Sequence, residues 1–250
     1  MLDLHTHTVF SDGKNTPEEM VQAALEKGLT CIGFSDHSYV EMDGSSMKPE
    51  NVEAYRKEIA RLKTVYRERI EIRCGLERDY YTDDIPEYDY IIGSVHWVQM
   101  PDGHRMAVDW KPEYLENDVK RYFGGDWYAM TEAFFALEAD VVRKTKCDLI
   151  GHFDLVCKFN EQGHFFDPEH PRYQAAWKKA ADALLSTGIP FEINTGAMSR
   201  GLTTDPYPSG PIREYLRSRG AKLILSSDAH RKENIAYAFD RYCHEVTIGV

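Results

Sequence analysis

Residues 2–13 read LDLHTHTVFSDG and combine a short apolar run with three candidate metal ligands, His5, His7 and Asp12. In an extended strand, side chains two residues apart project to the same face, so His5 and His7 can share one cation through their imidazole nitrogens. Asp12 follows in a Ser-Asp-Gly turn that can fold its carboxylate back toward the strand end. Two alternating histidines are also typical of the polar face of a half-buried strand, so their interpretation depends on the rest of the chain.

Outward from this stretch, short apolar runs alternate with helical patterns. The predicted strands are 29–35, 70–76, 88–95, 147–151, 189–193, 222–225 and a terminal strand, 244–248. The predicted helices are 17–27, 49–68, 127–144, 171–187, 211–219 and 232–242. The long loops are 97–125, which carries a short helix near 112–122 and is the expected lid, and 153–170. Because strands and helices alternate with no break in composition, we predict one α/β domain built as a parallel barrel.

Side chains that can bind a metal lie at or just beyond the ends of these strands. They are His5, His7, His37, Glu77, His96, His152, Asp228 and His230. In a parallel barrel the carboxyl ends of the strands converge on one face, where functional sites are built. With Asp12 they give nine nitrogen or oxygen ligands and no thiolate, a set that suits Zn²⁺, Mn²⁺ or Fe²⁺. One ion uses about four protein ligands, so the set predicts two or three ions that share a carboxylate. Closely spaced ions generate hydroxide near neutral pH and assist phosphoryl transfer.

The composition is that of an acidic globular protein. Apolar residues make up 42% of the 250 residues, charged residues make up 28%, and the formal net charge is −11. This charge argues against a nucleic-acid-binding face. The five cysteines are widely spaced, which indicates free thiols in a reducing compartment. The sequence shows neither an export signal nor a run long enough to span a membrane, so we expect a cytoplasmic protein.

The motifs DLHTHT, SDG, FSDHS, GLERDY, GSVHW, GHFD, EINT and SSDAH follow one another across nearly the whole chain. In these motifs the sequence resembles the PHP (polymerase and histidinol phosphatase) superfamily, and within it the stand-alone histidinol-phosphate phosphatases. The resemblance implies a distorted (β/α)7 TIM-like barrel, with residues 1–250 forming a single metal-dependent phosphoesterase domain. It also implies hydrolysis of L-histidinol phosphate in histidine biosynthesis, by a hydroxide that bridges metal ions.

The resemblance further implies a role for each candidate residue. The first ion would be held by His5, His7, Glu77 and Asp228, and Glu77 would bridge to a second ion held by His96 and His152. The third ion would be held by Asp12, His37 and His230. The catalytic residues would be Glu77, Asp228 and His230, and the phosphate would be bound by Lys158 and Arg200. Lys158 stands where the family pattern has arginine, and either cation also fits an ordinary loop charge. Glu192 fits a residue that orients a ligand or an ordinary ion pair inside the barrel.

Several alternatives stay open from the sequence. A related phosphatase could act on a phosphotyrosine, a nucleotide or a sugar phosphate. A metal-dependent amidohydrolase shares the His-x-His opening and a late aspartate, but it usually has a bridging lysine in the place of Glu77. A metal-binding module without activity is the remaining alternative. The groups available for the cationic part of a substrate are numerous and include Asp79, Tyr80, Tyr81, Trp97, Asp109 and Trp110, so none is singled out.

Overall fold

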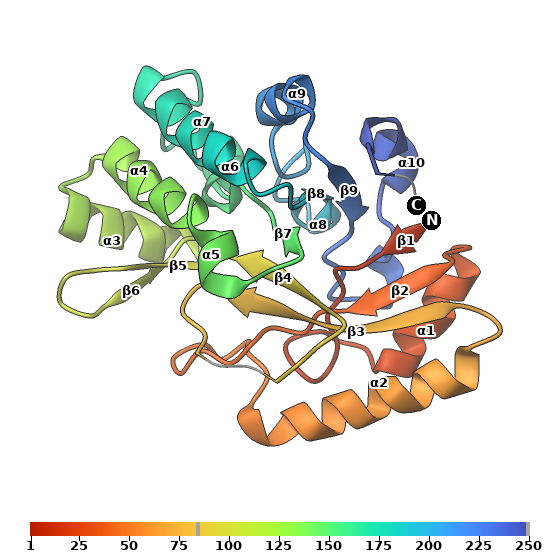
Figure 1. Ribbon diagram of the computed structural model, residues 1–250. Coiled ribbons are helices and arrows are strands. Elements are labelled where there is room, and N and C mark those ends of the chain that lie inside the picture. Colours follow the sequence, from red (N-terminus) through yellow and green to blue (C-terminus); the bar gives the residue numbers. More distant parts are fainter. Residues whose placement is uncertain (84–85, 249–250) are drawn as a thin grey trace.

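The computed structural model describes residues 1–83 and 86–248, and a sheet of seven parallel strands lies at its centre (Figure 1). In spatial order the strands are β1 (Leu2–Asp3), β2 (Cys31–Phe34), β3 (Glu71–Asp79), β4 (Tyr90–Ser94), β7 (Leu149–Ile150), β8 (Phe191–Asn194) and β9 (Leu223–Ser226). Neighbouring strands pair in parallel throughout. Past the ends of β1 and β9, an isolated parallel bridge joins Thr6 to Ala229, and the backbone N of His7 donates to the Ala229 oxygen at 2.9 Å. The sheet is therefore a nearly closed barrel, and the predicted fold is confirmed.

Most of the predicted helices are present around this sheet. They are α1 (Pro17–Glu26), α2 (Val52–Tyr66), α3 (Pro112–Phe123), α4 (Trp127–Glu138), α7 (Pro171–Leu185) and α9 (Gly210–Ser218). α1 starts where the sequence predicts, because Thr16 and Glu19 form a reciprocal capping box ahead of Pro17. Within the described residues, no helix is both long and apolar enough to cross a membrane.

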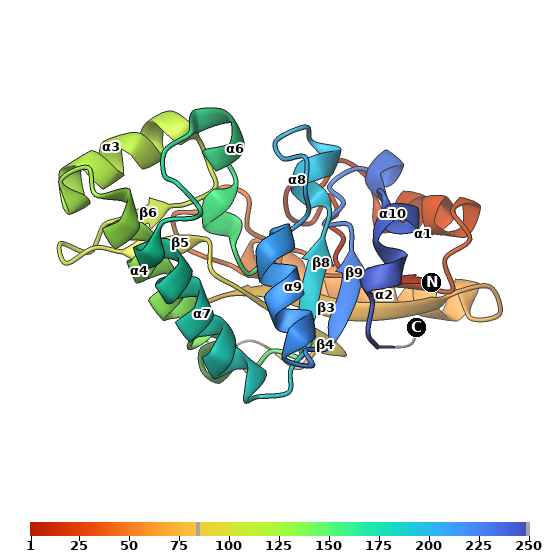
Figure 2. The ribbon, with the colours of Figure 1, turned by 90° about the horizontal axis from the view of Figure 1, so that it is seen from above.

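The predicted helix 127–144 is interrupted, and the lid loop contains a hairpin. α4 ends at Glu138 and a separate α5 (Val141–Thr145) follows, because Asp140 between them turns its carboxylate to Arg143 and to the Tyr80 hydroxyl. Aspartate favours such local bonds over the helix interior. Within 97–125, β5 (Trp97–Gln99) pairs with β6 (Arg105–Ala107) in an antiparallel hairpin. Seen from above, α3, α4, α6 (Asn160–Gly163), α7 and this hairpin lie on one side of the molecule, and α1 and α10 (Phe239–Tyr242) lie on the other (Figure 2).

The predictions for the last part of the chain are wrong. The helix predicted at 232–242 is replaced by η3 (Lys232–Asn234) and the short α10 (Phe239–Tyr242), because Ala236 and Ala238 between them have φ of 52° and 55°. The strand predicted at 244–248 is absent, and η4 (Cys243–Glu245) covers its first two residues. Glu245 instead accepts a hydrogen bond from Arg213 at 3.0 Å, which binds this segment to α9.

Three short elements also occupy regions predicted as loop. They are η2 (Leu155–Cys157), α6 (Asn160–Gly163) and α8 (Gly196–Ser199). All three follow strands β7 and β8, on the side where the predicted ligands gather. Together with the hairpin, they build the surroundings of the site from short pieces that have no strong sequence pattern.

Candidate metal centre

The structure brings all nine predicted ligands together at the carboxyl ends of the strands. Three overlapping groups place their ligand atoms within 4.8 Å of one another: His5, His7 and Asp228; His37, Glu77 and His96; and His7, Asp12, His37 and His230. His152 joins them because its Nε2 lies 2.8 Å from Glu77 Oε1. The predicted convergence of these side chains is thus a property of the fold, whereas the division of ligands among individual ions remains a prediction.

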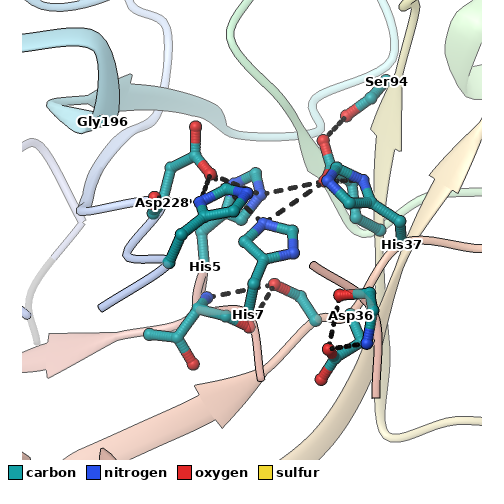
Figure 3. A network of polar contacts seen from close by, with 12 residues as sticks. His5, His7, Asp36, His37, Ser94, Gly196 and Asp228 are labelled. Atoms are coloured by element: carbon teal, nitrogen blue, oxygen red, sulfur yellow. Dashed lines mark hydrogen bonds and ion pairs between the residues drawn. The ribbon is translucent and has the colours of Figure 1, made fainter. Parts of the chain in front are cut away.

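Glu77 lies at the middle of the cluster and faces five imidazoles. Its Oε2 is 3.2 Å from His5 Nε2, 3.5 Å from His7 Nε2 and 2.8 Å from His37 Nδ1. Its Oε1 is 2.8 Å from His152 Nε2, is 3.3 Å from His96 Nε2, and accepts a hydrogen bond from Ser94 (Figure 3). Burial alone would raise the pKa of Glu77, but the neighbouring histidines hold that pKa well below its usual value. The carboxylate is therefore ionised and placed to serve two cations at once.

His5 and His7 follow β1 and are fully buried, but their neighbours differ. Glu192 Oε1 lies 2.7 Å from His5 Nδ1, while its Oε2 accepts the backbone N–H of His152 at 3.1 Å. Glu192 thus orients a candidate ligand, which is one of its two predicted roles. The pKa of His7 is lowered to about 3 by burial and by the nearby His230 and His37. His7 is therefore neutral, as a metal ligand must be.

Asp12 reaches the cluster because hydrogen bonds fix the turn before it. The buried carboxylate of Asp36 accepts hydrogen bonds from the backbone N and the hydroxyl of both Thr8 and Ser11. Gly13 packs so closely on the backbone that an added Cβ would lie 2.5 Å from the carbonyl carbon of His7. Asp12 Oδ1 consequently lies 3.2 Å from His230 Nε2. Sequence reasoning missed Asp36, although it directly precedes a predicted ligand in FSDHS.

Asp228 is held in a backbone conformation that few residues adopt. Its φ is 47°, in the left-handed region, which aspartate tolerates better than most residues. A Cβ at Gly196 would come within 2.6 Å of its carboxylate, so only glycine leaves room for this placement (Figure 3). Asp228 Oδ1 lies 3.2 Å from His7 Nε2. Although burial would raise the pKa of Asp228, Arg200 and His5 hold it well below its usual value. Strained residues of this kind concentrate at functional sites.

The residues present fit a cluster of divalent cations. Several of their buried nitrogen and oxygen atoms make no hydrogen bond with any described residue, although most of them lie close to another ligand atom: His5 Nε2, both ring nitrogens of His7, Asp12 Oδ1 and Glu77 Oε2. Leaving buried polar atoms unpaired costs free energy, and native proteins avoid it unless another group satisfies them. A donor set of imidazoles and carboxylates without thiolate suits Zn²⁺, Mn²⁺ or Fe²⁺.

The two predicted phosphate-binding cations lie at the edge of the cluster. Arg200 is the C-cap residue of α8. Its guanidinium lies 3.3 Å from Asp228 Oδ2 and 3.3 Å from His230 Nδ1. Lys158 is the C-cap residue of η2, and its Nζ donates a hydrogen bond to Asp109 Oδ2 at 3.0 Å. Only 14% of the Lys158 side chain is exposed, so this residue is not an ordinary solvated loop charge.

Comparisons with known proteins agree with this architecture. The PHP domain family matches residues 3–196. A Deinococcus radiodurans protein named "Probable histidinol-phosphatase" is 30% identical over 96% of this chain and 90% of its own length. A Listeria monocytogenes structure covers 97% of this chain and 100% of its own, with a TM-score of 0.87 and 20% identity. The histidinol phosphate phosphatase of Lactococcus lactis, complexed with zinc, L-histidinol and phosphate, covers 98% of this chain and 91% of its own, with a TM-score of 0.75 and 22% identity.

Proposed function

Because the chain belongs to the PHP family, we propose that it is a histidinol-phosphatase, which hydrolyses L-histidinol phosphate to L-histidinol and phosphate in histidine biosynthesis. The observation that carries this proposal is the convergence of nine nitrogen and oxygen ligands around the Glu77 carboxylate. Such a centre suits a phosphomonoesterase, because two or three divalent ions, when bound, would lower the pKa of a shared water and neutralise the charge of the phosphate. The name of the Deinococcus relative supports the choice of substrate.

The ligand assignment is part of the proposal. We infer that two or three ions of zinc, manganese or iron are held by His5, His7, Asp12, His37, Glu77, His96, His152, Asp228 and His230. Glu77 would bridge, since it is the carboxylate with imidazoles on both of its oxygens.

The protein's own groups have separable tasks in the hydrolysis of a phosphate ester. Glu77 and Asp228 supply the negative charge that keeps cations close together, and His230 lies between Asp12 and Arg200 at the edge of the cluster. We assign these three residues, Glu77, Asp228 and His230, to catalysis. Arg200 would bind the phosphate oxygens by charge and hydrogen bonds, and Lys158 would add a second positive charge.

The extent and setting of the protein follow from the same proposal. Asp228 and His230 complete the ligand set although they lie beyond the matched residues 3–196, so we infer that 1–250 is one phosphoesterase domain. The five free cysteines favour a reducing compartment, which supports the cytoplasm as its location. The net charge of −11 supports a small phosphorylated substrate as the partner rather than a nucleic acid.

The test is a comparison of substrates with metal-replete protein. We expect kcat/KM for histidinol phosphate to exceed that for p-nitrophenyl phosphate and common sugar phosphates by ~10² or more, because each well-placed charge-assisted contact contributes about 10- to 100-fold. Equal or faster turnover of a phosphotyrosine peptide or a nucleotide would replace this substrate with another phosphate ester. No turnover of any ester by protein whose metal content is verified would reject the phosphatase itself.

A further inference from the structure

Asp109 is a partly buried acid beside the metal centre, and the proposed reaction assigns it no task. It follows the hairpin β5–β6, and the preceding residue, Val108, donates its backbone N–H to the carbonyl oxygen of His96 at 3.0 Å. That bond fixes the lid segment, at Val108, directly against a proposed ligand. Asp109 therefore reaches the centre from the lid, whereas the ligands reach it from the barrel strands.

Asp109 pairs with a proposed phosphate-binding cation, which places its carboxylate at the edge of the site. Burial would raise the pKa of Asp109, but the charges of Lys158, His96 and His152 lower it. Its one hydrogen-bond partner among the described residues is Lys158, which donates to Oδ2 at 3.0 Å, and only 25% of the Asp109 side chain is exposed. A carboxylate accepts up to about four hydrogen bonds, so Asp109 has capacity left for a second cation.

We propose that Asp109 binds the positively charged amino group of the substrate while Lys158 turns to the phosphate. This inference rests on the proposed function. In the free protein the two side chains neutralise each other at the edge of the cluster. In the complex, the phosphate dianion of the substrate would pair with Lys158, and its ammonium group would pair with Asp109.

The chemistry of the exchange explains how the site would discriminate between esters. In histidinol phosphate the amine is attached to the carbon next to the one that bears the ester, so its two charged groups are close neighbours. If an ester without an amine drew Lys158 to its phosphate, Asp109 would be left half-buried without a counter-charge, and this is costly. Asp109 therefore favours the amino ester by attraction and disfavours other esters by the penalty of its unpaired charge.

The experiment compares histidinol phosphate with 3-(imidazol-4-yl)propyl phosphate, which has the same skeleton but no amine. The quantity measured is the ratio of kcat/KM for the two esters in metal-verified protein. In Asp109→Asn this ratio should fall by about 10- to 100-fold relative to the wild type. In Lys158→Met both esters should lose kcat/KM together, without a fall in the ratio.

Asp118→Asn is the matched control, because Asp118 lies in the same lid segment but pairs with His104 at 2.8 Å. Its ratio should equal that of the wild type. If the wild type prefers histidinol phosphate and Asp109→Asn keeps the ratio within about threefold, the assignment of Asp109 is wrong while the proposed function stands. If the wild type shows no preference for histidinol phosphate over p-nitrophenyl phosphate, the proposed function fails as well.

Discussion

The metal centre has two parts that are supported differently. The floor group, His5, His7 and Asp228, is almost completely buried. The rim group consists of Asp12, His37 and His230, whose side chains are 32%, 15% and 21% exposed. The floor group is fixed to the barrel, because Asp3 accepts the backbone N–H groups of Ser227 and Ala236. The rim group depends on a turn and on residues after strand ends. We therefore expect an ion at the rim to exchange more readily than one at the floor.

The strongest test of this comparison is to remove the charge shared by both parts. Glu77→Gln keeps the size of the side chain but leaves neighbouring cations without a bridging anion. Activity should fall at least ~10²-fold, on the scale of losing preorganised electrostatic stabilisation. Steady-state kinetics with elemental analysis would measure it, and activity within about threefold of the wild type would exclude Glu77 as a bridge.

A smaller effect should follow from loosening the floor alone. Glu192→Gln replaces the charged partner of His5 by an amide, and the affinity for the tightest-bound ion should fall about 10- to 100-fold. Glu138→Gln is the matched control, because Glu138 is also fully buried but has no hydrogen-bond partner among the described residues. Chelator titration should show a lower metal affinity for Glu192→Gln than for Glu138→Gln. Equal metal affinities of the two variants would mean that Glu192 does not support the floor group.

Removing a ligand of the rim group should release one ion and leave the other ions bound. Asp12→Asn removes the rim carboxylate that lies 3.2 Å from His230, so the metal content should fall from close to three ions per chain by about one. We expect a loss of activity of about 10-fold, since the floor ions stay in place. Elemental analysis after dialysis measures the loss. If all ions leave together, the floor and the rim are a single cooperative unit and the comparison fails.

Sequence reasoning predicted that the proposed ligand side chains converge, because most of them lie near the end of a strand with a clear local pattern. It did not predict the groups that hold them. Asp36 is linked to Thr8 and Asp3 to Ser227, contacts that join distant parts of the chain and leave no local signal. The hairpin β5–β6 was missed because its three-residue strands are too short to show alternation. The end of the chain was predicted wrongly because tertiary bonds, such as that between Arg213 and Glu245, override propensity there.

The smallest predicted effect concerns Asp154, a buried acid two residues after the proposed ligand His152. Burial raises the pKa of Asp154 to about 6, above its usual value, in contrast to Glu77 among its imidazoles. A raised carboxyl pKa stabilises the fold at low pH, and this contribution is lost as the pH rises through about 6. Asp154→Asn should therefore gain about 1 kcal/mol of unfolding free energy at pH 8 relative to pH 5.

Urea unfolding of the wild type and the variant at both pH values measures this gain as a difference, which cancels the pH dependence that the two proteins share. Asp182→Asn, an exposed aspartate paired with Arg219, is the control and should show no such gain. If the gain is absent, Asp154 is already ionised in the folded protein at pH 5, as Glu77 is.

The bridge between Thr6 and Ala229 also determines when the centre can form during translation. The ribosome releases His5 and His7 first, but their buried partner Asp228 only after more than two hundred further residues. A nascent chain that stops before Ser227 lacks both the partner of Asp3 and the last two ligands. We therefore expect tight metal uptake only from chains that already include Asp228 and His230. A shorter chain keeps an open barrel edge, which proteases and chaperones can recognise.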